Sequence, residues 1–440
     1  MPLITGFCTR NFGFWRPNLW RTFSPDIHIK KGVIIVVKTV TVVDARMGRG
    51  KTSAAIRYMN QNRKDRRFLF VTPYLTEVER ICGYCDFEEP EGDIGTKSAN
   101  LKLKMRMKRN LAMTHSLFYL MDLEALELAR ENGYSIIIDE SINVVDKITT
   151  SAKDFNLILT LTTEDEMGRL TWNDPEYEGR FSDYKALADQ GNLFRLDSAL
   201  LNVINPDIFT SFDEVVMLTY LFEGQTQKAY LDYFSIPYRV VGIERDEYGY
   251  KFSDHPDAPP PVDFTGLIHI VGKPKMNLPF RGRYTLSKNW FNKKSGNDPE
   301  VVLLRKYLNT LFASITKTDA AHRIWTCYKE DKNKITGPQG KYSSSFLPMN
   351  IRATNEYRDA TAVAYLVNRF CDPNLVKFFG VRGISIDHDQ FALSEMIQFI
   401  WRSAIRDNQP ITVYIPSERM RNLLINWMKS ISQQGDNALE

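Results

Sequence analysis

Residues 39–61 read TVTVVDARMGRGKTSAAIRYMNQ, and the order of residue types in this stretch decides the fold class. The stretch begins with β-branched residues typical of a buried strand, passes through a short loop with two glycines, and continues into a segment typical of a helix. A strand, a glycine-containing loop and a helix in that order are the setting of a phosphate-binding loop. We therefore expect an α/β fold that binds ATP through Ala45, Arg46, Met47, Gly48, Arg49, Gly50, Lys51 and Thr52.

Each residue type in this loop suits a phosphate. Gly48 and Gly50 allow the backbone amides to curl around the phosphates, and Lys51 can reach the outer ones. Thr52 offers a hydroxyl ligand for Mg²⁺. Ala45 stands where glycine is commoner, a departure that its small side chain makes tolerable. The alternative is a Gly-Lys turn that binds no nucleotide.

A second motif, SIIIDE at 135–140, ends a buried strand with two adjacent carboxylates. Ligands gather at the carboxyl ends of strands in open α/β sheets. We expect Asp139 to hold Mg²⁺ and Glu140 to orient and partly deprotonate the water that attacks the terminal phosphate. The alternative is a solvated Asp-Glu pair at a turn, and the phosphate-binding loop earlier in the same domain argues against it.

Strand-like and helix-like stretches alternate along the chain, which predicts parallel sheets. Strands are expected at 39–43, 68–71, 136–138, 215–218, 323–327 and 411–415, and helices at 53–61, 75–82, 122–132, 301–315, 360–369 and 393–405. The expected parts are an N-terminal extension at 1–30, a first lobe at 31–240 with a helical insertion at about 150–205, a linker or irregular insertion at 241–300, and a second lobe at 301–440.

Composition places the chain among globular proteins. Of its 440 residues, 43% are hydrophobic and 25% are charged, and the net charge is only +4. So small a charge neither requires nor excludes a nucleic-acid partner. The most apolar run, 33–43, contains Lys38 and is far shorter than the ~20 residues of a membrane span, and the N-terminal residues form no secretory signal. We expect a cytoplasmic protein without a membrane anchor, in the host cytoplasm if the chain is viral.

Short blocks in a characteristic order resemble the superfamily 2 helicases, most closely putative DNA helicases of bacteriophages. Around the acidic pair lie FVTPY at 70–74, THSLF at 114–118 and MLTY at 217–220. The second lobe contributes RATNEYRD at 352–359 and a further block at 398–406. The resemblance implies two RecA-like lobes with parallel sheets, which close on ATP in the cleft between them and step along a strand.

The resemblance also implies which residues contact the strand, namely Thr72, Pro73, Thr114, His115, Thr354, Asn355 and Arg358. The acidic block reads DESI at 139–142 instead of DEAD, and the block at 218–220 reads LTY instead of SAT. These departures favour single-stranded or forked DNA over RNA as the partner. Trp401 stands where glycine is usual in the last block, which leaves open which of its arginines is the catalytic one.

Gln398, Arg402 and Arg406 recur every fourth residue. If 393–406 is helical, these side chains share one face with a drift of about 40° per step. An arginine presented by one lobe to a phosphate held by the other stabilises the transition state and makes hydrolysis depend on lobe closure. We therefore expect all three residues to act in catalysis. The alternative is a solvated basic face of a helix.

Positive charge is concentrated at 97–109, where Lys102, Lys104 and Arg106 lie close together. A track of phosphate contacts is one interpretation, because neutralising the backbone supplies most sequence-independent affinity for nucleic acid. Leucine and methionine alternate with the charges, so an amphipathic surface element is an equal alternative.

Together the motifs predict an ATP- and Mg²⁺-dependent DNA helicase of phage DNA replication or recombination. A nucleic-acid-stimulated ATPase that translocates on DNA or remodels it without separating strands would carry the same residues. A third possibility is a DNA-binding accessory protein that binds nucleotide without hydrolysing it. Glu140 and the paired arginines argue against this third class, because a nucleotide switch has less need of them.

Overall fold

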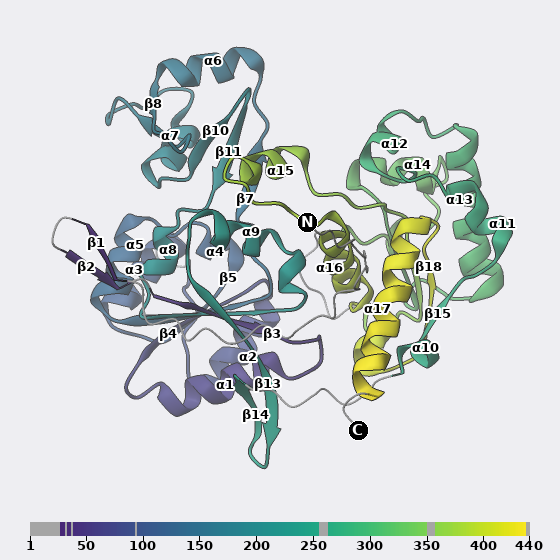
Figure 1. Cartoon of the computed structure of the whole chain (residues 1–440), viewed down its shortest axis with the longest axis horizontal. Helices are drawn as coiled ribbons and strands as arrows, with labels where there is room; N and C mark the ends of the chain where they lie inside the picture. The colour runs from purple at the N-terminus through teal and green to yellow at the C-terminus, as the bar shows by residue number, and fades with distance from the viewer. Residues whose placement is uncertain are drawn as a thin grey trace, which may run out of the picture. The chain divides into compact units, whose positions relative to one another are not determined.

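The computed structural model describes residues 27–30, 33–36, 38–92, 95–254, 263–349 and 357–436. The chain divides into residues 1–37 and residues 38–440. In the first part, β1 (Ile27–Lys30) and β2 (Val33–Val36) pair as an antiparallel hairpin, and the rest of the expected N-terminal extension lies outside the described residues. The second part contains two sheets built mainly of parallel strands with helices packed on them, so the expected α/β class is confirmed (Figure 1).

A seven-stranded sheet forms the first lobe. Its strands are β3 (Val40–Asp44), β4 (Arg67–Thr72), β5 (Leu111–Thr114), β6 (Tyr134–Asp139), β12 (Glu214–Thr219), β13 (Tyr238–Asp246) and β14 (Gly249–Ser253). In space the order is β14-β13-β3-β12-β6-β4-β5, and every neighbouring pair is parallel except β13 and β14. Thus β3, which leads into the glycine loop, and β6, which ends in the acidic pair, flank β12.

Helices cover both faces of this sheet. One face carries α1 (Lys51–Asn62) and α2 (Leu75–Cys85); the other carries α3 (Lys97–Arg106), α4 (His115–Phe118), α5 (Leu123–Glu131), α8 (Asp207–Thr210) and α9 (Thr226–Tyr233). Along β4, Phe68 and Phe70 join the first core, whereas Leu69 and Val71 join the second. A strand buried on both faces is an unbroken apolar run, which is why these strands could be recognised in the sequence.

An insertion between β6 and β12 has a small apolar core of its own. It consists of β7 (Val145–Ile148), α6 (Ala152–Thr160), β8 (Thr162–Glu164), β9 (Leu170–Trp172), α7 (Ser182–Asp189), β10 (Leu193–Leu196) and β11 (Ala199–Val203). Strands β10, β11 and β7 make an antiparallel sheet, and β8 pairs with β9. The insertion was expected to be helical, and this was wrong because it contains five strands as well as two helices. These strands are too short for an alternation of apolar and polar residues to be recognised in the sequence.

A four-stranded parallel sheet with the order β15-β18-β17-β16 forms the second lobe. Its strands are β15 (Ile268–Ile270), β16 (Arg323–Thr326), β17 (Ala362–Tyr365) and β18 (Ile411–Tyr414). The sequence predicted β16 and β18. It predicted a helix at 360–369, where the structure has β17, because a short apolar run fits a buried strand as well as a buried helix.

The helices of the second lobe are α10 (Phe264–Leu267), α11 (Pro274–Asn277), α12 (Lys288–Asn292), α13 (Pro299–Asn309), α14 (Lys332–Thr336), α16 (His388–Ile400) and α17 (Glu418–Asp436). Helix α15 (Pro373–Gly380) lies between β17 and α16 in the sequence but packs on the first lobe, where Phe378 and Phe379 join the core. Within the described part of the chain, no helix combines the length and the apolar character needed to cross a membrane.

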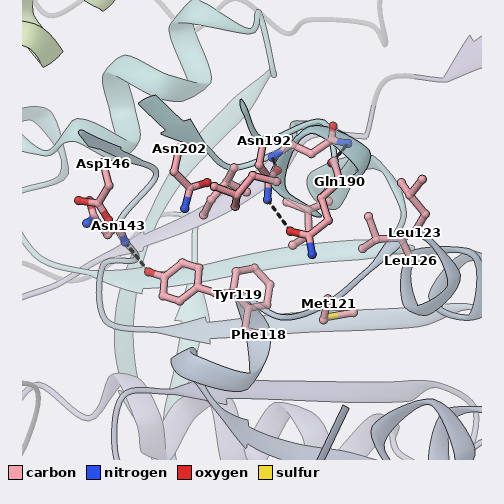
Figure 2. A pocket seen from close by; sticks show the side chains of 14 residues that line it. Phe118, Tyr119, Met121, Leu123, Leu126, Asn143, Asp146, Gln190, Asn192 and Asn202 are labelled. Carbon is pink, nitrogen blue, oxygen red and sulfur yellow. Dashed lines mark hydrogen bonds between the residues drawn. The ribbon is translucent and has the colours of Figure 1, made fainter. Parts of the chain in front are cut away.

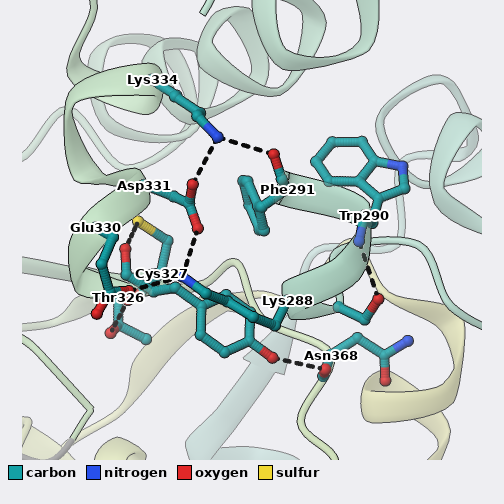
Figure 3. Close-up of polar contacts among 11 residues, drawn as sticks. Lys288, Trp290, Phe291, Thr326, Cys327, Glu330, Asp331, Lys334 and Asn368 are labelled. Carbon is teal, nitrogen blue, oxygen red and sulfur yellow. Dashed lines mark hydrogen bonds and ion pairs between the residues drawn. The ribbon is translucent and has the colours of Figure 1, made fainter. Parts of the chain in front are cut away.

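The linker expected at 241–300 is instead divided between the two lobes. Strands β13 and β14 complete the first sheet, and β15 joins the second. Figure 3 shows how α12 is fastened to the carboxyl end of β16: the buried Asp331 carboxylate lies 3.3 Å from Lys288 Nζ and 2.7 Å from Lys334 Nζ. Lys334 also donates to the carbonyl of Phe291 at 2.8 Å.

Candidate functional site

The glycine loop joins β3 to α1 and requires glycine at two positions. Gly48 and Gly50 have φ values of 76° and 79°, in the left-handed region that residues with a side chain rarely adopt. At Gly50 an added Cβ would also come within 2.4 Å of the Tyr250 ring on β14. The loop can therefore take this path only with glycine at Gly50, and its first helical residue is Lys51.

Lys51 points back into the loop from the start of α1. Its Nζ donates to the carbonyl of Ala45 at 2.6 Å and to that of Arg46 at 3.4 Å. Burial lowers the pKa of Lys51, and the nearby charges of Glu140 and Asp139 oppose that shift. A half-buried ammonium at the first turn of a helix, near two carboxylates, is suited to an anionic ligand such as a phosphate.

The acidic pair ends β6. Burial, together with the neighbouring Glu140 carboxylate, raises the pKa of Asp139. Glu140 has a φ of 66°, a strained value for a residue with a side chain, and its N–H donates to the carbonyl of Leu218 at 3.0 Å. Such strain is typical of functional positions, where the surrounding structure holds a residue in an unfavourable conformation.

Strand β12 fastens both motifs together. The Ala45 N–H at the start of the loop donates to the carbonyl of Thr219 at 3.1 Å, while Glu140 binds the preceding carbonyl on the same strand. The block at 217–220 thus connects the glycine loop to the acidic pair through backbone hydrogen bonds. The same block reaches the second lobe, because Trp427 Nε1 on α17 donates to the Tyr220 hydroxyl at 2.9 Å.

The second lobe presents Gln398, Arg402 and Arg406 to this site. The helix expected to carry all three ends at Ile400, so only Gln398 lies on α16. Arg402 lies in the following turn, where its guanidinium donates to the carbonyl of Met349 at 3.1 Å, and Arg406 lies in a 3-10 turn at Ala404–Asp407. The expected helical face was therefore wrong, although the three side chains do converge.

One pocket of about 290 Å³ collects side chains from both lobes. It is lined by Met47, Gly48, Gly50, Lys51, Thr52, Ser53, Tyr74, Glu77, Arg80, Asp139, Glu140, Gln398, Trp401, Arg402 and Arg406. Of the predicted loop residues, Ala45, Arg46 and Arg49 are not among its lining residues. The two lobes are packed directly together beside it, since a Cβ on Gly224 of the first lobe would come within 2.5 Å of the Gln390 backbone on α16.

Trp401, the departure from the usual glycine, belongs to an aromatic cluster between the lobes. Its ring centroid lies 5.4 Å from those of Phe264 and Trp427. The Arg46 guanidinium of the glycine loop lies 4.9 Å from the Phe264 ring centroid. Arg46 thus contacts the second lobe through a cation–π interaction instead of lining the pocket.

Sequence reasoning missed one wall of the pocket. Tyr74, Glu77 and Arg80 recur every third residue at the start of α2, and the Glu77 and Arg80 side chains form an ion pair of 2.7 Å. The block at 70–74 was expected to contact nucleic acid, and the residues after it were not considered for the ATP site. Residues three apart lie on one face of a helix, so Glu77 and Arg80 follow Tyr74 along the side of α2 that lines the pocket. This spacing of three residues was the signal in the sequence that could have revealed them.

The donor set fits a magnesium ion held together with a nucleotide. The Thr52 and Asp139 side chains line the same pocket and offer the hard oxygen ligands that Mg²⁺ prefers. In the described ranges there is no group of three or more His, Cys, Asp or Glu residues that could hold a metal alone. A cation here would need further oxygen ligands, which phosphates and water supply in nucleotide sites.

Comparison with known proteins identifies the family. A family model described as the YonV C-terminal Rossmann-like domain matches residues 262–428, which include all four strands of the second lobe. Over 416 residues the chain is 36% identical to the SPbeta prophage-derived uncharacterized protein YonV of Bacillus subtilis (strain 168), covering 90% of this chain and 100% of that protein. The chain belongs to the YonV family.

Likeness to solved structures is weak. A variant of Dbp5 from S. cerevisiae bound to RNA and ADP BeF3 aligns with a TM-score of 0.37 and 9% identity, covering 90% of this chain and 84% of that one. A second Dbp5 structure, with ADP, aligns with a TM-score of 0.30 and 10% identity, over 89% and 84% of the two chains. Scores of this size identify neither an activity nor a ligand.

In this YonV-family chain, two residues expected to contact a strand are buried. Thr72 is fully buried at the end of β4, ahead of the half-buried Pro73. His115 is 2% exposed, and its Nε2 lies 2.9 Å from the carbonyl oxygen of Asp139. The Thr114 hydroxyl accepts a hydrogen bond from the Leu117 N–H and caps α4. The expected direct contacts are corrected for Thr72 and His115, and His115 instead supports the acidic pair.

The basic stretch at 97–109 is largely neutralised within the first lobe. Lys102 Nζ lies 2.8 Å from Asp122 and 2.6 Å from Glu124, and Arg106 also pairs with Glu124. Lys104 Nζ lies 3.0 Å from Glu88. Lys102 and Lys104 are half-buried, and all three cations are paired with carboxylates, so they offer little to a phosphate track. The structure therefore favours the alternative, an amphipathic surface helix.

The remaining strand-contact prediction concerns the block at 352–359. Thr354 and Asn355 lie outside the described residues. Arg358 forms a two-pronged ion pair with Asp407, next to Arg406. The pair raises the pKa of Arg358 and lowers that of Asp407. Arg358 thus connects this block to the turn that presents Arg406.

Proposed function

We propose that this chain is an ATP-driven DNA helicase, a motor that couples ATP hydrolysis to movement along DNA and to strand separation. The observation that carries the proposal is the single pocket in which the glycine loop, the acidic pair and two arginines of the other lobe converge. A site assembled from two lobes makes hydrolysis sensitive to their relative position. Such sensitivity is what a motor requires.

The chemistry of ATP hydrolysis can be assigned to this chain's own side chains. The backbone amides after Gly48 and the Lys51 ammonium would hold the phosphates. Thr52 and Asp139 would hold Mg²⁺, which neutralises charge on the transferring phosphate when bound. Glu140 would orient the attacking water and accept its proton. The arginines would stabilise the charge that develops in the transition state.

Coupling between ATP and DNA would pass through β12 and its neighbours. The same strand holds the glycine loop, the acidic pair and, through Tyr220, helix α17 of the second lobe. Loss of the terminal phosphate would therefore shift the contacts between the two lobes. DNA is the proposed substrate because the relative is a prophage-derived protein and because the acidic block departs from that of the RNA helicases. Phage DNA replication or recombination is the proposed setting.

The first prediction tests the proposal as a whole. We expect single-stranded DNA to stimulate ATP turnover several-fold, with RNA less effective, and we expect the chain to separate a forked DNA duplex only when ATP and Mg²⁺ are present. ATPase assays with single-stranded DNA, duplex DNA and RNA, run beside a forked-duplex unwinding assay, measure both. Stimulation without unwinding would indicate a translocase, and turnover indifferent to every nucleic acid would contradict the proposal.

The second prediction concerns Glu140→Gln. Glutamine keeps the size of the side chain and the same strained backbone but cannot accept the proton of the attacking water. Hydrolysis should fall by about 10²-fold or more, on the scale that general bases contribute, while nucleotide affinity is retained. Single-turnover hydrolysis and binding of a fluorescent ATP analogue measure the two quantities. Glu131→Gln, an exposed residue at the end of α5, is the matched control.

A further inference from the structure

A second pocket, of about 210 Å³, lies where the insertion meets the first lobe. It is lined by Phe118, Tyr119, Met121, Leu123, Leu126, Asn143, Asp146, Leu187, Gln190, Asn192, Asn202, Ile204, Asn205 and Ile208. Figure 2 shows its two chemically different sides, with the amides of Gln190, Asn192 and Asn202 facing the rings of Phe118 and Tyr119. The pocket is smaller than the ~300–1,000 Å³ of sites for drug-sized ligands, so it suits a smaller group.

The lobe side of the pocket is aromatic and apolar. Phe118 and Tyr119 come from α4 and the turn that follows it, and α4 begins after Thr114 at the carboxyl end of β5. The Tyr119 hydroxyl accepts a hydrogen bond from the Asn143 N–H at 2.6 Å, which holds the ring in place. The side chain of Leu123 is half exposed next to Leu126, at the other end of this side (Figure 2). The Phe118 ring is fully buried, whereas the Tyr119 ring is half-buried, so Tyr119 offers the surface on which a planar group could stack.

The insertion side of the pocket carries polar groups whose hydrogen bonds are incomplete. Asn202 lies on β11, the central strand of its sheet, where asparagine is disfavoured. Its Oδ1 atom is buried and has no hydrogen-bond partner. Asn202 is paired across strands with Asp146 of β7, so the two side chains emerge on the same face. A buried amide oxygen without a partner costs stability, so a water molecule or a ligand group that completes its bonding would be favoured here.

The composition of the lining excludes a phosphate. None of its residues is Lys, Arg or His, and Asp146 adds a carboxylate, which would repel an anion. Neighbouring amides hold each other in position, since Asn192 Nδ2 donates to Gln190 Oε1 at 3.1 Å. The pocket therefore suits a small, uncharged, planar group with hydrogen-bond donors and acceptors on its edge. A nucleobase has all of these properties.

We propose that this pocket receives one unpaired nucleobase of the bound strand. The base stacks on the Tyr119 ring, and its edge bonds the amides of the insertion, chiefly Asn202. This assignment rests on the proposed function, because it requires a strand bound to the first lobe. It also assigns a function to the insertion, which supplies the polar side of the pocket that holds an unpaired base.

The test compares strands with and without bases. Binding of a single-stranded DNA oligonucleotide and of an abasic strand of equal length is measured by fluorescence anisotropy, with RNA oligonucleotides in parallel. Stacking on aromatic side chains should make the wild-type chain prefer the base-containing strand by about 5- to 150-fold. Asn202→Val should reduce that preference about 5-fold and leave affinity for the abasic strand unchanged. Its melting temperature should not fall, because valine suits a central strand and removes the unpaired oxygen.

Asn297→Val, at an exposed residue of the second lobe, is the matched control and should bind both strands as the wild type does. If Asn202→Val also binds both strands as the wild type does while nucleic acid still stimulates the ATPase, the pocket assignment is overturned and the proposed function stands. If no strand binds the wild type, both fail. If Asn202→Val folds poorly, the test uses a strand that contains the fluorescent base 2-aminopurine and the wild-type chain. Quenching of its fluorescence on binding supports stacking in the pocket, and unchanged fluorescence overturns the assignment.

Discussion

Replacing Lys51 with alanine is expected to reduce ATP turnover to background, a loss of at least about 10³-fold, on the scale that clamping cations supply in phosphoryl transfer. Lys51 is a half-buried cation of the first lobe that lines the pocket near Asp139 and Glu140. Without it, the two carboxylates would repel the phosphates of ATP. Nucleotide affinity should therefore fall together with turnover, which distinguishes this variant from Glu140→Gln.

The measurement is steady-state ATP turnover beside nucleotide binding for Lys51→Ala and for Lys64→Ala, an exposed lysine beyond the end of α1. Lys64→Ala should behave as the wild type. In the resting pocket Lys51 Nζ is bound to the carbonyl of Ala45, so the alanine variant loses a partly buried hydrogen bond as well as a charge. Thermal melting separates a loss of folding from a loss of chemistry. A folded Lys51→Ala protein with normal turnover would refute the phosphate-binding loop.

The motifs that could be predicted from the sequence are those whose chemistry is local. In the glycine loop the strand, the turn and the helix follow one another within about twenty residues, so residue type and spacing already specify its shape. The same holds for the acidic pair, because an apolar run delivers Asp139 and Glu140 to the end of a buried strand. No long-range information was needed for either motif.

Features that depend on packing between distant segments could not be predicted in the same way. The run at 360–369 is apolar enough for a helix or a strand, and only its pairing with β16 and β18 makes β17 a strand. Likewise, the carboxylates that pair with Lys102 and Lys104 come from segments about 20 residues away in the sequence. The sequence alone could not show that these lysines are paired. The basic stretch consequently looked like a binding surface when considered alone.

The second-lobe arginines combine both situations. Their identity was correctly selected as lining the pocket, but the helical face used to connect them does not exist, because α16 ends at Ile400. Arg402 lies in the turn that follows α16 and Arg406 in the 3-10 turn at Ala404–Asp407, and both still line one pocket. The spacing of four residues thus selected side chains that share a pocket although they share no helical face, and their catalytic role stays a prediction.

The two arginines differ in their surroundings, and this difference supports a prediction that the sequence left open. Arg402 is half-buried and donates to the carbonyl of Met349, so it helps to build the second lobe. Arg406 is exposed at the edge of the pocket, on the turn that the Arg358–Asp407 pair holds. We expect Arg406→Ala to reduce hydrolysis about 10³-fold with unchanged nucleotide affinity and melting temperature, as for a group that acts only on transition-state charge.

Arg402→Ala should also impair hydrolysis, but with a lower melting temperature, because hydrogen bonds from a charged donor contribute about 1.5–3 kcal/mol and the Met349 carbonyl would lose its partner. Single-turnover hydrolysis, nucleotide binding and thermal melting of both variants separate the two roles, with Arg281→Ala, an exposed arginine of the same lobe, as the control. In a Lys51→Ala background neither substitution should have a further effect on turnover, since the nucleotide is no longer held. Full activity in both single variants would mean that the second lobe takes no part in hydrolysis, and the pocket would then serve nucleotide binding without driving a motor.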